Sequence, residues 1–156
     1  MTIYDIGVYG KNEDEFFDAL VSEGIQLFID IRQRRGMRGS QYSFVNSTYL
    51  QNKLKRLDIE YWYIRKLAPT TEIRNAQKEH DILMKTEKQK RKSLGNVFIE
   101  QYQQQVLDDF DLELIIPSIL QKNTVFFCVE KECLACHRHL VTEKLYKEYK
   151  LESRHL

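Results

Sequence analysis

"IQLFIDIR", residues 25 to 32, is the stretch of the sequence that decides the fold class. Its apolar residues are nearly continuous over the length of one strand, and a glycine, Gly24, comes directly before it. A strand without polar alternation is typical of a sheet that is covered on both faces. The run therefore predicts an interior strand of a parallel sheet with helices on either side.

Predicted helices and strands alternate outward from this run. Three further segments have strand character, namely residues 2–10, 59–64 and 123–129. Three have helical spacing or caps, namely residues 12–24 with Asn12 as the cap, residues 46–58 and residues 136–150. This alternation implies right-handed crossovers between parallel strands. We therefore predict an α/β fold, a three-layer sandwich with a mostly parallel sheet of about four strands and helices on both faces.

Residues 71–121 interrupt the alternation with a longer and more polar helical pattern. The stretch "SLGN" (93–96) predicts a break, and a second helix is expected to end around Pro117, which can kink that helix or belong to a following turn. A chain of 156 residues has the size of one domain. We therefore predict a single domain over residues 1–156, in which residues 71–121 form a helical, lid-like insertion.

Composition and charge restrict the class of protein. Lys and Arg together number 24 against 23 Asp and Glu, so the net charge of +1 gives no overall polyanion-binding signature. No run approaches the roughly 18 apolar residues of a membrane span, and the N-terminal residues lack the pattern of a signal peptide. We expect a cytoplasmic protein with no membrane partner, and the sequence leaves its oligomeric state open.

Basic residues gather in two short runs despite the neutral total. "RQRRGMR" (32–38) has four arginines and no acid, and "KTEKQKRK" (85–92) has five basic residues against one glutamate. Either run is compatible with a phosphate contact or with an ordinary solvated surface.

"CVEKECLACHRHL", residues 128 to 140, contains all three cysteines and two of the four histidines. In a reducing compartment, an odd number of cysteines argues against a disulfide framework. Cys128 is expected at the end of a strand and Cys136 at the start of a helix. Loops at the carboxyl ends of parallel strands open on one edge of the sheet. We therefore expect this segment and the arginine run 32–38 to share one crevice.

Four interpretations of the cysteine segment remain open on the residues alone. Residues 133–137 match the C-x-x-C-H motif of c-type haem, but haem attachment belongs to secreted chains, so we expect no cofactor. Zinc is a second interpretation, with Cys128, Cys133, Cys136 and either His137 or His139 as ligands, although only one C-x-x-C is present. The segment can also be purely structural, with Cys128 in the core and the other residues capping a helix.

The fourth interpretation is an activated thiolate beside an anion site. A cysteine at a helix N-terminus next to cationic side chains has a lowered pKa, and Cys136 is followed by His137 and Arg138. Arg138 can hold a phosphate with two hydrogen bonds, and His137 can exchange a proton near neutral pH. Glu130 can orient either of them.

Asp30 and Arg32 present a similar choice at the end of the 25–32 strand. They can brace the sheet edge as an ion pair, or Arg32 can face the crevice together with the arginines that follow it.

The chain resembles the DUF488 family, a domain of unknown function, at four stretches in order and over nearly its whole length. These are "YDIGVYG" (4–10), "LFIDIR" (27–32), "YWYIRKLAP" (61–69) and "FFCVEKECLACHR" (126–138). The resemblance implies a three-layer α/β fold and no reaction. The signature positions of the family correspond to Asp30, Arg32, Cys128, Glu130, Cys136, His137 and Arg138, and the resemblance favours functional roles for the last three. Cys133 is outside the family pattern, which argues against zinc and haem, and "LAPTTE" (67–72) stands where a Leu-Gly-Gly-like turn is usual.

These observations lead to one hypothesis and two alternatives. The hypothesis is a crevice for a phosphate-bearing small molecule, such as a nucleotide, or for a nucleic-acid end, and it leaves open whether the protein is an enzyme. The anion-binding residues are Arg32, Arg34, Arg35, Arg38 and Arg138. Cys136 is the nucleophile or thiolate acceptor, His137 the acid or base, and Glu130 and Asp30 orient them. The alternatives are a non-catalytic nucleic-acid-binding module and a structural zinc site at Cys128, Cys133, Cys136 and His137.

Overall fold

Five parallel strands form one sheet in the order β3-β2-β4-β1-β5. This computed structural model describes residues 2–156. The strands are β1 (Thr2–Ile6), β2 (Leu27–Asp30), β3 (Glu60–Tyr63), β4 (Thr124–Phe127) and β5 (Glu152–His155). The helices are α1 (Glu13–Ser22), α2 (Ser47–Arg56), α3 (Thr71–Leu83), α4 (Asn96–Tyr102), α5 (Ile116–Ile119) and α6 (His137–Tyr149). The quoted run therefore contains an interior strand, β2, as predicted.

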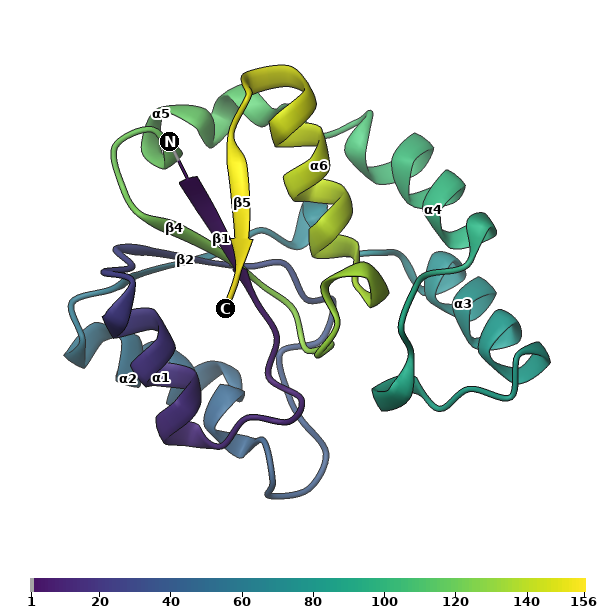
Figure 1. Cartoon of the computed structure of the whole chain (residues 1–156), viewed down its shortest axis with the longest axis horizontal. Coiled ribbons are helices and arrows are strands. Elements are labelled where there is room, and N and C mark those ends of the chain that lie inside the picture. The colour runs from purple at the N-terminus through teal and green to yellow at the C-terminus, as the bar shows by residue number, and fades with distance from the viewer. Residues whose placement is uncertain (1) are drawn as a thin grey trace.

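The side chains of β2 divide between two hydrophobic cores. Successive residues of a strand point to opposite faces, and Leu27 and Ile29 join one core while Phe28 joins the other. The first core includes residues of α3, α4 and α6, and the second includes residues of α1 and α2. Figure 1 shows α1 and α2 on one side of the sheet and α5 and α6 on the other. The three-layer α/β prediction is confirmed.

The predicted start of the first helix is also present. The Asn12 side chain accepts a hydrogen bond from the Glu15 N–H, and the Glu15 carboxylate accepts one from the Asn12 N–H, each at 2.8 Å. This capping box satisfies two N–H groups that the first turn leaves free.

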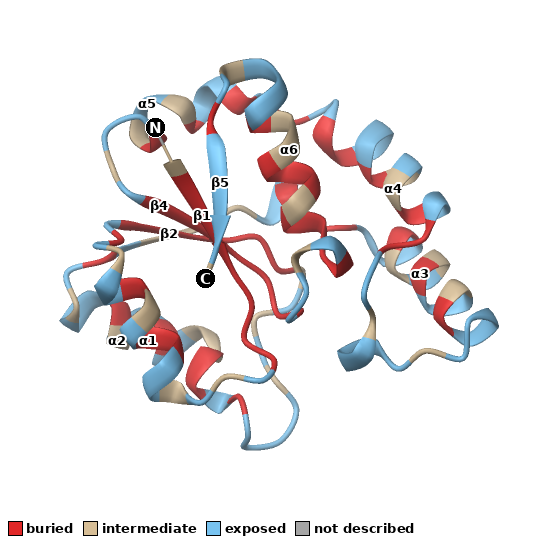
Figure 2. Ribbon diagram, viewed as in Figure 1, coloured by how far each residue is buried: buried red, intermediate tan, exposed pale blue. Residues whose placement is uncertain are grey.

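The sheet has five strands, where about four were predicted. The additional strand, β5, pairs in parallel with β1 at one edge of the sheet, and all four of its residues are exposed (Figure 2). Because its sequence, "ESRH", lacks buried apolar positions, hydrophobic periodicity gave no signal for it.

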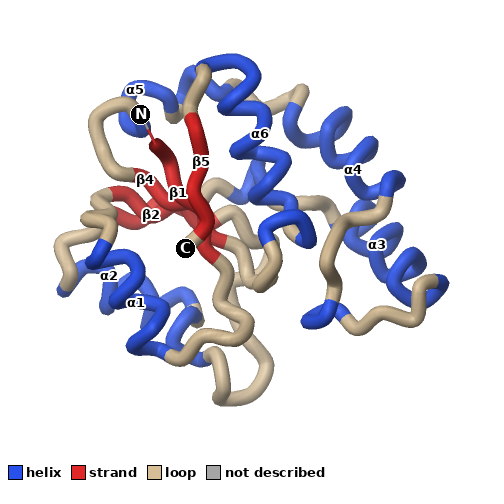
Figure 3. Tube along the Cα trace, viewed as in Figure 1, coloured by secondary structure: helices blue, strands red, loops and turns tan. Residues whose placement is uncertain are grey.

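Residues 71–121 contain several short helices separated by turns, as the tube in Figure 3 shows. The predicted break at 93–96 is confirmed, because α3 ends at Leu83 and α4 begins at Asn96. The predicted helix end at Pro117 is wrong, since α4 gives way to a wider turn of helix at residues 103–107 and Pro117 lies in the first turn of α5. Proline suits that position because a first-turn N–H has no partner within its helix.

The loop after β1 packs closely against the loop after β4. The N–H groups of Val8 and Tyr9 both donate to the Val129 carbonyl at 3.1 Å. A Cβ atom at Gly7 would lie 1.9 Å from the Glu130 carbonyl oxygen, so only glycine fits there. This contact fixes the backbone that leads into the cysteine segment.

None of the helices within residues 2–156 combines the length and the apolar character needed to cross a membrane.

Candidate functional site

A cavity of about 500 Å³ lies at the carboxyl edge of the sheet. Its lining comes from the loops after β1, β2 and β4, from the start of α6, and from α3 and the segment that follows it. The arginine run and the cysteine segment therefore border one space, as the parallel sheet predicted. A larger and more open hollow of about 820 Å³, at residues 24–26 and 57–61, is lined by neither cysteine nor histidine. We therefore take the first cavity as the candidate site.

The side chains around this cavity are predominantly basic. Only one acidic residue, Glu130, is in the lining. The basic residues are Arg32, Arg34, Arg38, Arg74, Lys78, Lys88 and Arg91. The first three come from run 32–38 and the last two from run 85–92, so both basic runs contribute. Clustered charge of one sign within a concavity attracts ligands of the opposite sign.

Arg32 is held at the cavity by Asp30. The Asp30 carboxylate accepts hydrogen bonds from Arg32 Nε at 2.9 Å and from Arg32 Nη2 at 2.7 Å, and a third from Tyr61 Oη at 2.8 Å. The guanidinium also lies over the Phe127 ring. Arg32 is only 3% exposed, and its Nη1 has no hydrogen-bond partner among residues 2–156. Buried N–H groups are rarely left unpaired, so this one marks a position for an acceptor.

The other arginines of the run lie in two places. Arg34 and Arg38 are exposed and line the cavity. Arg35 is outside the lining, because its guanidinium stacks 4.0 Å from the centre of the Tyr63 ring and donates to Tyr61 Oη at 3.5 Å. The structure therefore brings Arg34 and Arg38, but not Arg35, to the same space as the cysteines.

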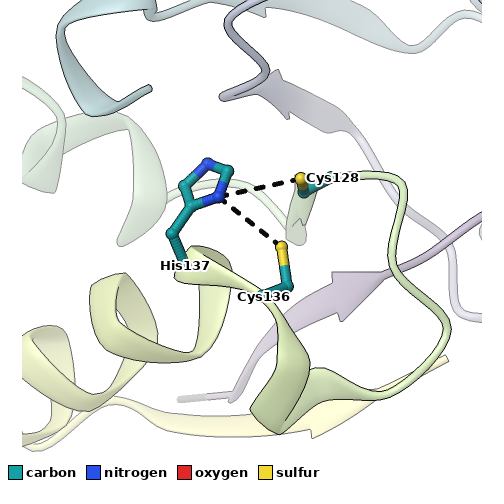
Figure 4. Close-up of side chains that lie close together, drawn as sticks. All are labelled: Cys128, Cys136 and His137. Carbon is teal, nitrogen blue, oxygen red and sulfur yellow. Dashed lines mark hydrogen bonds between the residues drawn. The ribbon is translucent and has the colours of Figure 1, made fainter. Parts of the chain in front are cut away.

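The side chains of Cys128, Cys136 and His137 lie close together in a buried cluster (Figure 4), and all three residues line the cavity. His137 Nδ1 lies 3.8 Å from Cys128 Sγ and 3.7 Å from Cys136 Sγ. His137 Nε2 lies 2.8 Å from the Ile31 carbonyl oxygen, which can only accept, so Nε2 carries a proton. Nδ1 is therefore the nitrogen that faces both sulfur atoms.

The two thiols of the cluster differ in acidity. The hydrogen bond from Cys136, aided by the nearby His137 and Arg138, holds the pKa of Cys128 well below its ordinary value although burial opposes this. Burial, followed by the hydrogen bond to Cys128 and its charge, raises the pKa of Cys136 well above its ordinary value. The position of Cys136 at a helix start predicts a thiolate at Cys136. The contacts in the structure instead favour the thiolate at Cys128.

Glu130 follows Cys128 by two residues and also lines the cavity. Its carboxylate lies 3.8 Å from Lys88 Nζ and 3.9 Å from Arg91 Nη1. Burial raises the pKa of Glu130 to about 7, although Lys88 lowers it in part.

Arg138 is fully buried and has partners inside the chain. Its Nε donates to Asp5 at 2.7 Å, Nη1 to the Glu130 carbonyl at 2.8 Å and Nη2 to the Lys131 carbonyl at 3.3 Å. It does not line the cavity. Arg138 thus ties β1 to the loop after β4, and its predicted contact with an anion stays a prediction.

Cys133 is separated from the other two cysteines. Its potential ligand atoms group with Asp5 and His155 and not with Cys128, Cys136 and His137. Burial, together with Asp5, raises the pKa of Cys133 to about 12. Among the described residues, the four-ligand zinc set is therefore not assembled, and His139 is in neither group.

Sequence reasoning missed several residues of the site. Tyr102 packs against the His137 ring with centroids 5.4 Å apart and donates to the Leu67 carbonyl. Arg91 is fixed by Asp81 at 2.7 Å, and Asp81 accepts a second hydrogen bond from Gln77 at 2.7 Å. Arg91 could have been found from the basic run 85–92. Gln77 and Tyr102 lie in ordinary helical patterns, and nothing in the sequence distinguishes them as site residues.

A protein-family model described as "Domain of unknown function DUF488" matches residues 12–145. The chain belongs to this family. The match contains β2, the cavity-lining arginines, the cysteine cluster and most of α6. No curated protein and no solved structure matches the chain. The DUF488 assignment therefore agrees with the resemblance seen in the sequence and does not specify a reaction.

Proposed function

We propose that this DUF488 protein binds a phosphate-bearing small molecule of nucleotide size in the basic cavity, with the Cys128, Cys136 and His137 cluster as the chemical group that meets it. The observation that supports this most directly is Arg32, whose Nη1 has no partner within the described chain while Asp30 holds the rest of the guanidinium. An arginine fixed in this way is prepared to bind a phosphate oxygen.

The remaining lining supports the same class of ligand. Seven basic residues and one acid line the cavity. Arg32 and Arg91 are paired with Asp30 and Asp81 behind the lining, and the remaining positive charge compensates a dianionic group that enters. A volume of about 500 Å³ is within the range of small-molecule pockets. Tyr9 and Tyr42, with ring centroids 5.3 Å apart, add aromatic surface for a base or a similar ring.

In this proposal the residues of the site have different roles. Arg32, Arg34 and Arg38 bind the anion, and Asp30 positions Arg32. His137 holds a proton at Nε2 and presents Nδ1 to the sulfurs. Glu130 exchanges a proton at the cavity wall, while Arg138 keeps the surrounding backbone in place. A phosphate-bearing small molecule is preferred to a nucleic acid because the site is a cavity with walls from several separate segments of the chain.

Calorimetric titration of the protein with inorganic phosphate, a nucleoside 5′-monophosphate and a single-stranded oligonucleotide tests the proposal. Lys88 lines the cavity and Lys90 of the same turn does not, which gives a matched pair of variants. We expect Lys88→Ala to weaken nucleotide binding roughly fivefold, as about 1 kcal/mol predicts. Lys90→Ala should leave it unchanged.

Two results contradict the proposal. If neither phosphate compound binds, or if both lysine variants bind the nucleotide as the wild type does, the cavity is not the phosphate site. Tight binding of the oligonucleotide alone, with a steep dependence on salt, would support the nucleic-acid-binding module instead.

A further inference from the structure

The cysteine cluster has a geometry that its predicted role as a nucleophile does not require. A zinc ion lies about 2.3 Å from a cysteine sulfur and about 2.0–2.1 Å from a histidine nitrogen, so a tetrahedral angle separates the two ligand atoms by about 3.6 Å. The separations here are 3.7 and 3.8 Å, from one nitrogen to two sulfurs. The three ligand atoms all lie within 4.8 Å of one another. One cation can therefore contact all three atoms.

The surroundings of His137 also fit a metal ligand. A metal-bound histidine usually donates its second ring N–H to a carbonyl or carboxylate, which fixes the ring. His137 does so through Nε2 to the Ile31 carbonyl at 2.8 Å, and the Tyr102 ring packs against it. The free nitrogen is thereby aimed at both sulfurs before any ion binds.

Charge favours the same occupant. Two thiolates buried side by side would repel each other and burial would penalise each of them, so both thiols can ionise together only beside a compensating positive charge. A divalent cation neutralises both charges, and thiolate and imidazole ligands suit zinc and similar thiophilic ions. All three side chains also line the cavity, so a metal among them borders that space.

We propose that Cys128, Cys136 and His137 bind one thiophilic divalent cation of the zinc class, with a fourth coordination position open to the basic cavity. Cys133 is not a ligand. Three protein ligands with one open position are typical of catalytic zinc sites, whereas structural sites are closed by four. A water molecule or an oxygen of an anionic ligand would fill the fourth position. The site rests on the cluster geometry and does not depend on the phosphate proposal.

Metal titration of the full chain, purified without a polyhistidine tag and stripped with a chelator, tests this site. We expect one equivalent of Co²⁺ to give the absorption of a tetrahedral cobalt–thiolate centre, and Zn²⁺ to displace it. His137→Gln and Cys128→Ser should weaken binding by more than the roughly 10–100-fold that loss of a second-shell partner costs. Cys133→Ser, in the same segment but outside the cluster, is the matched control and should bind one equivalent.

Alkylation of the wild type provides a readout that needs no variant and so remains valid if a variant fails to fold. Zn²⁺ should slow the alkylation of Cys128 and Cys136 in mapped peptides and leave that of Cys133 unchanged. The proposal is wrong if the stripped wild type gives no cobalt–thiolate spectrum with excess metal, or if Cys133→Ser abolishes that spectrum while remaining folded.

The phosphate proposal is assessed separately in the same stripped protein. Phosphate binding without metal binding would leave the proposed function in place and remove the metal site. Metal binding without phosphate binding would leave the metal site in place and contradict the proposed function.

Discussion

Two buried Asp–Arg pairs lie at the carboxyl edge of the sheet, and they have different consequences. Asp30 and Arg32 are at the end of β2, and Asp5 of β1 pairs with Arg138 of α6. Both arginines are at most 3% exposed. Each nitrogen of the Arg138 guanidinium donates within the chain, whereas Nη1 of Arg32 has no partner there.

The comparison shows that the residue pair alone does not identify a binding arginine. The leading hypothesis from the sequence had both arginines bind the anion, Arg32 from the end of the 25–32 strand and Arg138 from the start of a helix. The two arginines differ in whether a guanidinium nitrogen remains without a hydrogen-bond acceptor inside the protein. By this criterion Arg138 is an internal brace and Arg32 is available to a ligand.

The largest effect that distinguishes the pairs is expected from Arg138→Met. The substitution leaves Asp5 buried without its guanidinium and removes the donors to the Glu130 and Lys131 carbonyls. We expect the free energy of unfolding to fall by about 3–5 kcal/mol, measured by urea denaturation.

Arg154 provides the control for that experiment, since it pairs with Glu23 at 3.5 Å and is 62% exposed. Arg154→Ala should change the free energy of unfolding by no more than about 1 kcal/mol. If Arg138→Met is as stable as Arg154→Ala, Arg138 is not a brace and the contrast between the pairs disappears.

A smaller effect, and one on binding, is expected from Arg32→Lys. Lysine keeps the positive charge beside Asp30 but cannot offer the planar second set of donors. We expect the affinity for the nucleoside monophosphate to fall roughly 10–100-fold, which corresponds to about 1.5–3 kcal/mol for a charged hydrogen bond. Arg35→Lys, in the same loop but outside the cavity, should bind as the wild type does. Equal losses in the two variants would indicate a general effect of the loop.

The smallest expected effect concerns the pH dependence of the Asp5 pair. Burial alone would raise the pKa of Asp5, but the hydrogen bond from His155 and the charge and hydrogen bond of Arg138 lower it overall. The unfolded chain therefore binds more protons at acidic pH. The stabilisation is complete above the unfolded pKa of about 3.9 and is lost as the pH falls through the lower folded value.

Urea denaturation of the wild type and of Asp5→Asn, from neutral pH down to about pH 3, measures this contribution. We expect the wild type to lose more stability than the variant below about pH 4, because the amide does not titrate in that range. Parallel curves for the two proteins would mean that Asp5 is not stabilised as an anion.

The fold was predictable where burial leaves a pattern in the sequence. The continuous apolar run of β2 and the Asn12 cap predicted an interior strand and a helix start, and both are present. Strand β5 was not predicted, because it has no apolar face. Backbone pairing with β1 and contacts such as that of His155 with Asp5 hold it in the sheet. Pro117 was misplaced because proline is equally compatible with the position after a helix and with the first turn of the next.

The candidate site was predictable in its location and less so in its roles. Parallel strands put the loops after β2 and β4 at one edge, so the meeting of Arg32 with the cysteine segment followed from topology. Which nitrogen of His137 faces the sulfurs depends on the Ile31 carbonyl, 106 positions away in sequence, and no local pattern encodes it. The separation of Cys133 from Cys136 likewise depends on the short turn at Cys133–Ala135.

The position of β1 between β4 and β5 determines when the sheet can form during synthesis. Residues 2–6 emerge from the ribosome before both of their neighbours, residues 124–127 and 152–155. At about 5–20 residues per second, the first strand waits roughly 6–24 s for β4 alone. The nascent chain therefore carries an apolar strand without partners, and the central part of the sheet is completed only after β4 has been made.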